Sequence, residues 1–195
     1  MADNLIPLAR TARLDVLFTG YADERVAGTV SLIRDGDAVI VVDPGMVPSR
    51  AAILDSLGAL GVSPDEVTDI VLSHHHPDHT VNIALFGEIP VHDFQAVYHR
   101  DSWDERAADG VHLTPSVCLL ATPGHTPQDL SVLVGTTDHV VVLTHLWWTS
   151  HGPLDDPYAP DADALRTQRK RVLALADLVV PGHGPAFSPG RATPQ

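Results

Sequence analysis

The stretch SHHHPDHT carries four histidines and an aspartate in close succession. Imidazole nitrogen and carboxylate oxygen are ligands that zinc and similar borderline metals take in proteins. Because alternate side chains of an extended segment point the same way, we expect His74 and His76 to reach one metal together. Asp78 and His79 lie just beyond, where they can face a second metal, and His75 is expected to point away.

Two further histidines occur in similar settings and can supply the missing ligands. His125 lies in TPGHT and His183 lies in PGHGP, each directly after an apolar run. The glycine beside each histidine lets the backbone turn sharply. Three loops at strand ends, each carrying histidine, converge readily at one edge of a sandwich of sheets. One such histidine alone would indicate only a polar turn, but the whole set indicates a metal site.

Short apolar runs between turn residues predict the elements that must position these loops. Strands are expected at 13–19, on both sides of the Asp35–Gly36 turn within 28–43, and at 68–73, 88–93, 116–121, 129–136, 139–148 and 177–180. Helices are expected at 49–60, 80–87 and 161–176, the last with Asp161 as N-cap. Each half of the chain repeats a strand pair, a helix and a strand that ends at histidine. This pattern favours one α/β domain with helices outside two stacked sheets.

Composition limits the functional classes further. The 195 residues suffice for one domain with a substantial core. A formal net charge of −13 weakens a nucleic-acid-binding function, because phosphate contacts need a basic surface. The lone cysteine, Cys118, lies in the apolar run VCLLA and is expected to be a buried thiol. No apolar run is long enough to span a membrane, and no signal-peptide pattern opens the chain, so a cytoplasmic location is the default expectation.

Together these motifs resemble the metallo-β-lactamase superfamily. His74-x-His76-x-Asp78-His79 matches its HxHxDH signature, and DPG at 43–45, PGHT at 124–127 and PGHG around His183 follow in the same order. The resemblance implies an αββα sandwich of two mixed β-sheets flanked by helices, as a single domain over 1–195 with its core at about 14–187. The C-terminal half is similar to the small single-domain group around metallo-β-lactamase domain-containing protein one.

The resemblance also implies roles for individual residues. Each of two metal positions would have three ligands: His74, His76 and His125 for the first, and Asp78, His79 and His183 for the second. Asp43 would be a buried acid that steadies the ligand loops. The implied cofactor is Zn²⁺, one or two ions per chain, with iron or manganese as alternatives.

One position departs from the family pattern. Many hydrolases of this superfamily carry Gly-Asp at the strand before the last helix, and that aspartate bridges both metals. Here the stretch is VVLTHLWW, with Thr144 and His145 at the corresponding place. An imidazole cannot bridge as a carboxylate does without losing both ring protons. Three roles therefore stay open for His145: a terminal metal ligand, a hydrogen-bonding group in the pocket, or a structural residue.

The implied function is a zinc-dependent hydrolase that uses a metal-bound hydroxide to cleave a small ester, thioester, lactone or amide. Asp78 would orient that hydroxide or take its proton, besides binding a metal. The expected partner is a small-molecule substrate. Neither nucleic acid nor a membrane is expected, and a homodimer is left open.

The pocket is expected to be built from three loops, at 20–27, 94–112 and 147–160. The second of these is polar and is expected to be an irregular, exposed segment over the site. Trp147, Trp148 and His151 are candidate pocket residues, with one tryptophan in the core and the other in the pocket wall.

Three alternative functions share the same fold. A phosphodiesterase or ribonuclease could use the same two-metal site, and a basic groove would favour it. An iron-dependent redox enzyme would be indicated by iron in the purified protein. A non-catalytic binding protein is suggested by the absent bridging aspartate, although the six outer ligands are present.

Overall fold

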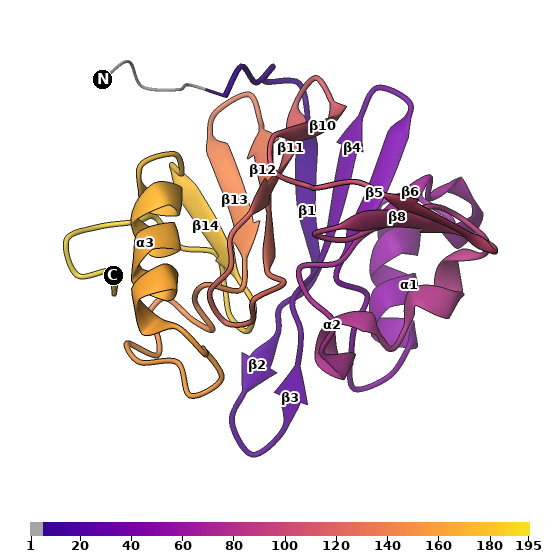
Figure 1. Cartoon of the computed structure of the whole chain (residues 1–195). Helices are drawn as coiled ribbons and strands as arrows, with labels where there is room; N and C mark the ends of the chain where they lie inside the picture. Colours follow the sequence, from indigo (N-terminus) through magenta and orange to yellow (C-terminus); the bar gives the residue numbers. More distant parts are fainter. Residues whose placement is uncertain (1–5) are drawn as a thin grey trace.

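The structure is a computed structural model that describes residues 6–195 (Figure 1). Two sheets face each other, with α1 against the outer face of one and α3 against the outer face of the other. The seven-stranded sheet contains, in spatial order, β1 (Arg13–Phe18), β4 (Val30–Asp35), β5 (Ala38–Val42), β6 (Asp69–Val71), β7 (Val91–His92), β8 (Ala96–His99) and β9 (Ser102–Glu105). The five-stranded sheet contains β10 (Val111–Thr114), β11 (Val117–Ala121), β12 (Leu130–Gly135), β13 (Val140–Thr144) and β14 (Leu178–Pro181).

The remaining elements are short. The helices are α1 (Ala51–Ala59), α2 (Pro77–Thr80) and α3 (Ala162–Leu173), with 3₁₀ turns at Pro64–Glu66 and Ile83–Phe86. A separate hairpin pairs β2 (Tyr21–Ala22) with β3 (Val26–Ala27) and projects from the edge where the two sheets meet (Figure 1). The longest described helix, α3, has 12 residues, and none of the helices within residues 6–195 could cross a bilayer.

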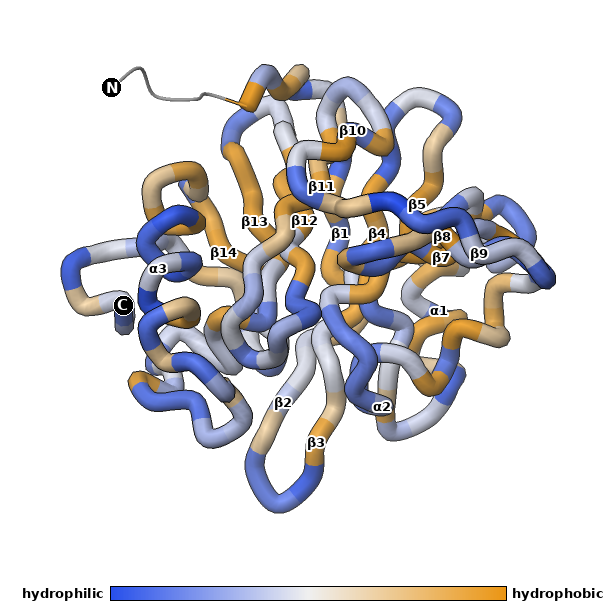
Figure 2. Tube along the Cα trace, viewed as in Figure 1, coloured by the Kyte–Doolittle hydropathy of each residue, from blue (hydrophilic) through white to orange (hydrophobic). Residues whose placement is uncertain are grey.

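Three apolar clusters hold these layers together. Ile40 and Val42 of β5 face the second sheet, whereas Val41 between them faces α1. In β12 the same alternation points Val132 toward the first sheet and Leu133 toward α3. Figure 2 shows apolar residues concentrated along the strands of the core, whereas α3 is largely hydrophilic along its length. Because successive residues face opposite layers, these strands are buried on both faces. Each fully buried apolar side chain stabilises the fold by about 1.5–3 kcal/mol.

Most of the predicted elements are confirmed, including the αββα sandwich. The turn after Asp35 joins β4 to β5, and the Asp161 carboxylate accepts hydrogen bonds from the backbone N–H groups of Asp163 and Ala164 as an N-cap. The predicted similarity between the two halves of the chain is also present. In the first half β5 pairs in parallel with β6, and in the second half β13 pairs in parallel with β14. Cys118 is fully buried.

The prediction of an irregular loop at 94–112 is wrong. This segment contains β8, β9 and the start of β10, and it extends both sheets. All four residues of β9 are exposed because it is an edge strand, so its sequence lacks the apolar alternation that indicates a strand. The predicted helix at 80–87 is instead the end of α2 and a 3₁₀ turn, and the hairpin β2–β3 was not predicted.

Asp35 joins the two sheets at the end away from the histidines, and its removal should destabilise the fold. Its carboxylate accepts hydrogen bonds from Thr11 Oγ1 at 2.7 Å, Thr114 Oγ1 at 2.6 Å and the Ser116 N–H at 3.2 Å. Burial raises the pKa of Asp35, but these hydrogen bonds outweigh burial and hold the pKa below its ordinary value. We expect Asp35→Ala to lower the free energy of unfolding by about 2 kcal/mol in urea titrations.

The pH dependence of this loss follows from the lowered pKa. The stabilisation is complete above the unfolded pKa of about 4 and disappears as the pH falls through the lower folded pKa. The difference between wild type and Asp35→Ala should therefore shrink under acid. Asp37→Ala, at the exposed neighbouring turn, is the matched control and should change stability by less than about 0.5 kcal/mol. Equal losses for both variants would contradict the role of Asp35.

Candidate metal centre

Six histidines meet where loops leave neighbouring strands at one edge of the sandwich. Three of them lie between β6 and α2 or within α2: His74, His76 and His79. The other three each follow a strand of the second sheet: His125 follows β11, His145 follows β13 and His183 follows β14. All except His76 are buried, and His76 is partly exposed. The prediction that separate loops bring histidines to one place is therefore confirmed by the geometry.

His74, His76 and His125 form one compact triangle. His74 Nε2 lies 3.0 Å from His76 Nδ1, and His125 Nε2 lies 3.2 Å from the same atom. Two ligands of a tetrahedral zinc ion are separated by about 3.3 Å, given Zn–N bonds of about 2.0–2.1 Å. Burial and the neighbouring histidines hold the pKa of His74 well below its ordinary value and also lower that of His76. The ligand atoms of the three residues lie within 4.8 Å of one another, so they could hold one metal ion.

Asp78, His79 and His183 form a second triangle. Asp78 Oδ2 lies 3.4 Å from His79 Nε2 and 3.5 Å from His183 Nε2. Burial raises the pKa of Asp78, but the hydrogen bond and charge of His79 outweigh burial and lower the pKa to about 2. Burial lowers the pKa of His79, whereas the carboxylates of Asp43 and Asp78 raise it to about 9. Asp78 is therefore an ionised ligand at neutral pH.

Asp43 lies behind both triangles, where the sequence placed it. Its Oδ2 accepts a hydrogen bond from His79 Nδ1 at 2.9 Å, and its Oδ1 accepts one from the Ser73 N–H at 2.6 Å. The Ser73 hydroxyl in turn lies 3.0 Å from His74 Nδ1. Asp43 adopts φ 53°, a left-handed conformation that aspartate tolerates better than most residues. This carboxylate thus orients ligand loops of both groups.

A second supporting acid, Asp156, was missed by the sequence analysis. Its Oδ2 accepts hydrogen bonds from His125 Nδ1 at 2.7 Å and from Trp148 Nε1 at 2.9 Å, and its Oδ1 accepts one from the Tyr158 N–H. The carboxylate is buried, and hydrogen bonding from His125 keeps its pKa low despite burial. Asp156 lies in a polar loop far along the chain from His125, so no local pattern could have indicated the contact.

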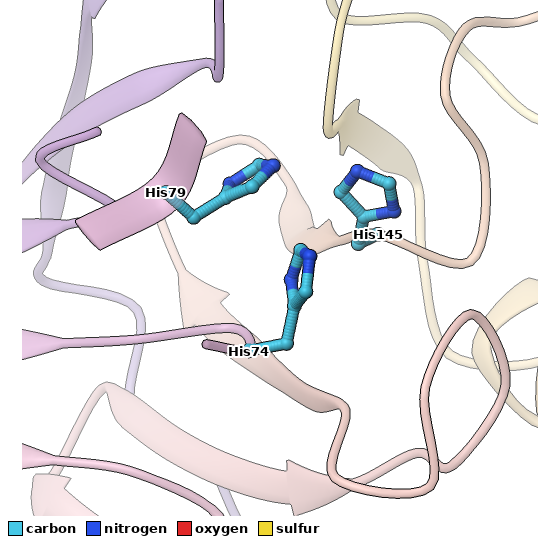
Figure 3. A group of neighbouring side chains, drawn as sticks. All are labelled: His74, His79 and His145. Atoms are coloured by element: carbon cyan, nitrogen blue, oxygen red, sulfur yellow. The ribbon is translucent and has the colours of Figure 1, made fainter. Parts of the chain in front are cut away.

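The ring of His145 lies close to those of His74 and His79, one from each triangle (Figure 3). Its Nε2 is 2.9 Å from His183 Nε2, and its ring also forms a group with His74 and His79 whose ligand atoms lie within 4.8 Å of one another. Among the described residues, His145 Nδ1 is a buried nitrogen without a hydrogen-bond partner. A buried unpartnered nitrogen is costly, and a bound cation would satisfy it. The residues present therefore fit a metal ion.

A cavity of about 390 Å³ opens beside these residues. Its walls come from the hairpin β2–β3 and from the loops that carry the ligands; the lining residues are Ala22, Asp23, Val26, His76, Pro77, Asp78, His125, Trp148, Tyr158 and His183. The rings of Trp148 and Tyr158 stack with centroids 5.9 Å apart. The predicted loops at 20–27 and 147–160 do line the pocket.

Two pocket predictions are wrong, those for 94–112 and His151, whereas the two tryptophans divide between core and pocket wall as expected. No residue of 94–112 lines the cavity, because β8 and β9 continue the sheet instead of covering the site. Trp147 is fully buried, and its Nε1 donates a hydrogen bond to the Pro194 carbonyl. His151 is exposed in the turn between Thr149 and Gly152 and does not line the cavity. Trp148 is therefore the tryptophan of the pocket wall.

Comparisons with known proteins identify the family. A model of the metallo-β-lactamase superfamily matches residues 23–93. Metallo-β-lactamase domain-containing protein 1 of Xenopus laevis is 33% identical over 186 residues, which cover 88% of this chain and 79% of that protein. The human protein of the same name is 40% identical over 157 residues, covering 76% of this chain and 59% of the relative. The chain thus aligns with about three fifths of the human protein.

Structure comparison agrees on the fold. The crystal structure of a quorum-quenching N-acyl homoserine lactone lactonase has a TM-score of 0.65 and 20% identity, covering 90% of this chain and 92% of the lactonase. The chain belongs to the metallo-β-lactamase superfamily. Its similarity to metallo-β-lactamase domain-containing protein 1 confirms the predicted group, and the predicted enzyme class, a metal-dependent hydrolase, is confirmed at the level of the superfamily.

Proposed function

We propose that the chain is a zinc-dependent hydrolase that cleaves a small ester, thioester, lactone or amide. The observation that carries the proposal is the joint placement of two ligand triangles beside one cavity. His76 and His125 of the first triangle and Asp78 and His183 of the second all line that cavity. A substrate carbonyl in the cavity would therefore lie next to both candidate metal positions.

Each triangle would hold one ion, and His145 would add a further ligand. When bound, zinc would polarise the substrate as a Lewis acid and would lower the pKa of the attacking water. Asp78 has a lowered pKa of about 2, so its carboxylate is ionised and can orient that water as a hydrogen-bond acceptor, while so weak a base is unsuited to taking its proton. Asp43 and Asp156 hold the ligand imidazoles in place through His79 Nδ1 and His125 Nδ1.

The cavity favours a substrate with an apolar part. Trp148 and Tyr158 form an aromatic wall, and Ala22 and Val26 of the hairpin supply apolar side chains. A volume of about 390 Å³ suits a small molecule. The net charge of −13 disfavours a polyanionic nucleic acid. The structurally similar lactonase shares only the fold, and it is a reason to include lactones among the substrates tested.

The test begins with plasma mass spectrometry on freshly purified protein, followed by hydrolysis assays with zinc restored. The panel should contain short-chain esters, thioesters, lactones and amides, with a phosphodiester as the competing class. We expect zinc in the protein and turnover of at least one carbonyl substrate that a chelator abolishes. Iron as the bound metal, or turnover of the phosphodiester alone, would overturn the proposal.

Asp156→Ala should weaken the first triangle without unfolding the chain. The variant leaves His125 Nδ1 and Trp148 Nε1 without their shared acceptor, and outer carboxylates of this kind change metal affinity or activity by about 10–100-fold. We expect a loss of zinc affinity in that range, measured by competition with a chromophoric chelator. Asp155→Ala, at the exposed neighbouring residue, should leave the affinity unchanged. Unchanged affinity in Asp156→Ala would show that the carboxylate does not support the site.

A further inference from the structure

Helix α3 buries an arginine at a position where helical spacing favours an apolar residue. The buried residues of this helix are Leu165, Arg169 and Val172, which follow one another at i, i+4 and i+7. Arg169 is fully buried, although it belongs to the basic run RTQRKR at 166–171. Burying a charged group costs free energy unless its polar atoms are satisfied, so the contacts of Arg169 have to account for its position.

Three backbone carbonyls accept hydrogen bonds from the Arg169 guanidinium. Nε donates to the Leu146 carbonyl at 2.9 Å, Nη1 to the Leu154 carbonyl at 2.9 Å and Nη2 to the Pro153 carbonyl at 2.7 Å. The planar fork of an arginine can reach several acceptors at once, whereas the ammonium of a lysine is a compact point charge. Arg169 therefore holds the two ends of the loop 146–154 together.

The loop 146–154 connects two parts of the metal centre. It starts directly after His145 and ends two residues before Asp156. The Asp156 carboxylate accepts the hydrogen bond of His125 Nδ1 at 2.7 Å, so its placement affects the first triangle. Burial lowers the pKa of Arg169, whereas the charge of Asp156 opposes this shift, because the cation and the carboxylate attract each other.

The start of this loop is held by two further hydrogen bonds. The Gly182 N–H donates to the Trp147 carbonyl at 3.0 Å. The His183 N–H donates to the Trp148 carbonyl at 2.7 Å. These contacts support the start of the loop without the arginine, whereas two of the three hydrogen bonds of Arg169 lie at its other end. Loss of the arginine should therefore release mainly the end that leads to Asp156.

We infer that Arg169 is a positioning residue of the metal centre: it fixes the end of the loop 146–154 and thereby places Asp156 to hold His125 at the first metal position. The inference rests on the proposed metallohydrolase function. Arg169 does not line the cavity, so its effect on a bound metal must pass through the loop.

The test measures zinc affinity rather than activity, by competition with a chromophoric chelator. Arg169→Met removes the three hydrogen bonds and keeps a long side chain in the core. We expect it to weaken, by about tenfold or more, the binding of the same zinc ion that Asp156→Ala weakens. The double variant Arg169→Met/Asp156→Ala should bind that ion within about threefold of Asp156→Ala alone, because both changes act through one carboxylate. Independent structural effects would instead multiply.

Matched variants keep the outcome interpretable. Arg166→Met removes an exposed arginine of the same helix and should leave zinc affinity unchanged. Arg169→Lys keeps the charge but not the fork, so it should lose affinity as Arg169→Met does. It also replaces that variant in the double-mutant comparison if circular dichroism shows that methionine prevents folding.

Three results would count against the inference. Unchanged zinc affinity in either Arg169 variant, or losses that multiply in the double variant, would overturn it while sparing the proposed function. A wild type that binds no zinc would overturn both.

Discussion

Gly45→Ala is expected to destabilise the protein by about 3 kcal/mol or more and to reduce its zinc content. Gly45 ends the DPG motif, and a Cβ there would overlap the backbone carbonyl of Asp78 and come within 2.5 Å of His79 Cα. That carbonyl also accepts hydrogen bonds from the N–H groups of Gly28 at 3.2 Å and Met46 at 3.1 Å. Because the Asp78 carbonyl is fixed by these two hydrogen bonds, it cannot move aside without breaking them. An alanine at position 45 would therefore displace the start of α2.

The measurement is urea denaturation followed by circular dichroism, with zinc counted separately. Gly58→Ala is the matched control, since Gly58 lies inside α1 and a Cβ there meets no atom within 4 Å. Alanine is favoured over glycine in a helix, so this variant should gain about 0.5–1 kcal/mol. If both variants unfold at similar urea concentrations, the close approach of Gly45 to the ligand loop does not constrain the fold.

His76→Ala is expected to lower kcat/KM by about 10³-fold or more on any substrate the enzyme hydrolyses. Both short nitrogen–nitrogen distances of the first triangle, 3.0 Å to His74 and 3.2 Å to His125, meet at His76 Nδ1. Loss of the ion would remove several kcal/mol of transition-state stabilisation, and about 4 kcal/mol corresponds to 10³-fold in rate. His76 is partly exposed, so the fold should tolerate the change.

The adjacent histidine provides the control for this experiment. His75 belongs to the same loop, but its ring points to Asp93, with Nε2 2.9 Å from the Asp93 carboxylate. We expect His75→Ala to change kcat/KM by less than about threefold. Comparable losses in the two variants would mean that the loop, and not the ligand at position 76, controls activity.

Local patterns were sufficient to predict much of this molecule. His74, His76, Asp78 and His79 lie on one short loop, so their spacing can be read directly from the sequence. Strands such as β5 and β12 are apolar on both faces, so their sequences indicate burial directly. By contrast, β9 lies at a sheet edge with all four side chains exposed, and its largely polar sequence predicts a loop.

Only the tertiary structure decided the contacts that join distant loops. Asp43 reaches His79 because the neighbouring parallel strands β5 and β6 end at the same edge of one sheet, and Asp156 reaches His125 because both residues follow strands of the five-stranded sheet. Trp147 and Trp148 are neighbours of the same type, so the sequence alone does not distinguish them. The direction of the chain after β13 places Trp147 in the core and Trp148 at the cavity. The same packing sets which ligands His145 Nε2 approaches. Residue types and local spacing determine which groups are available for a metal, whereas the three-dimensional packing of loops far apart in sequence determines which of them share one.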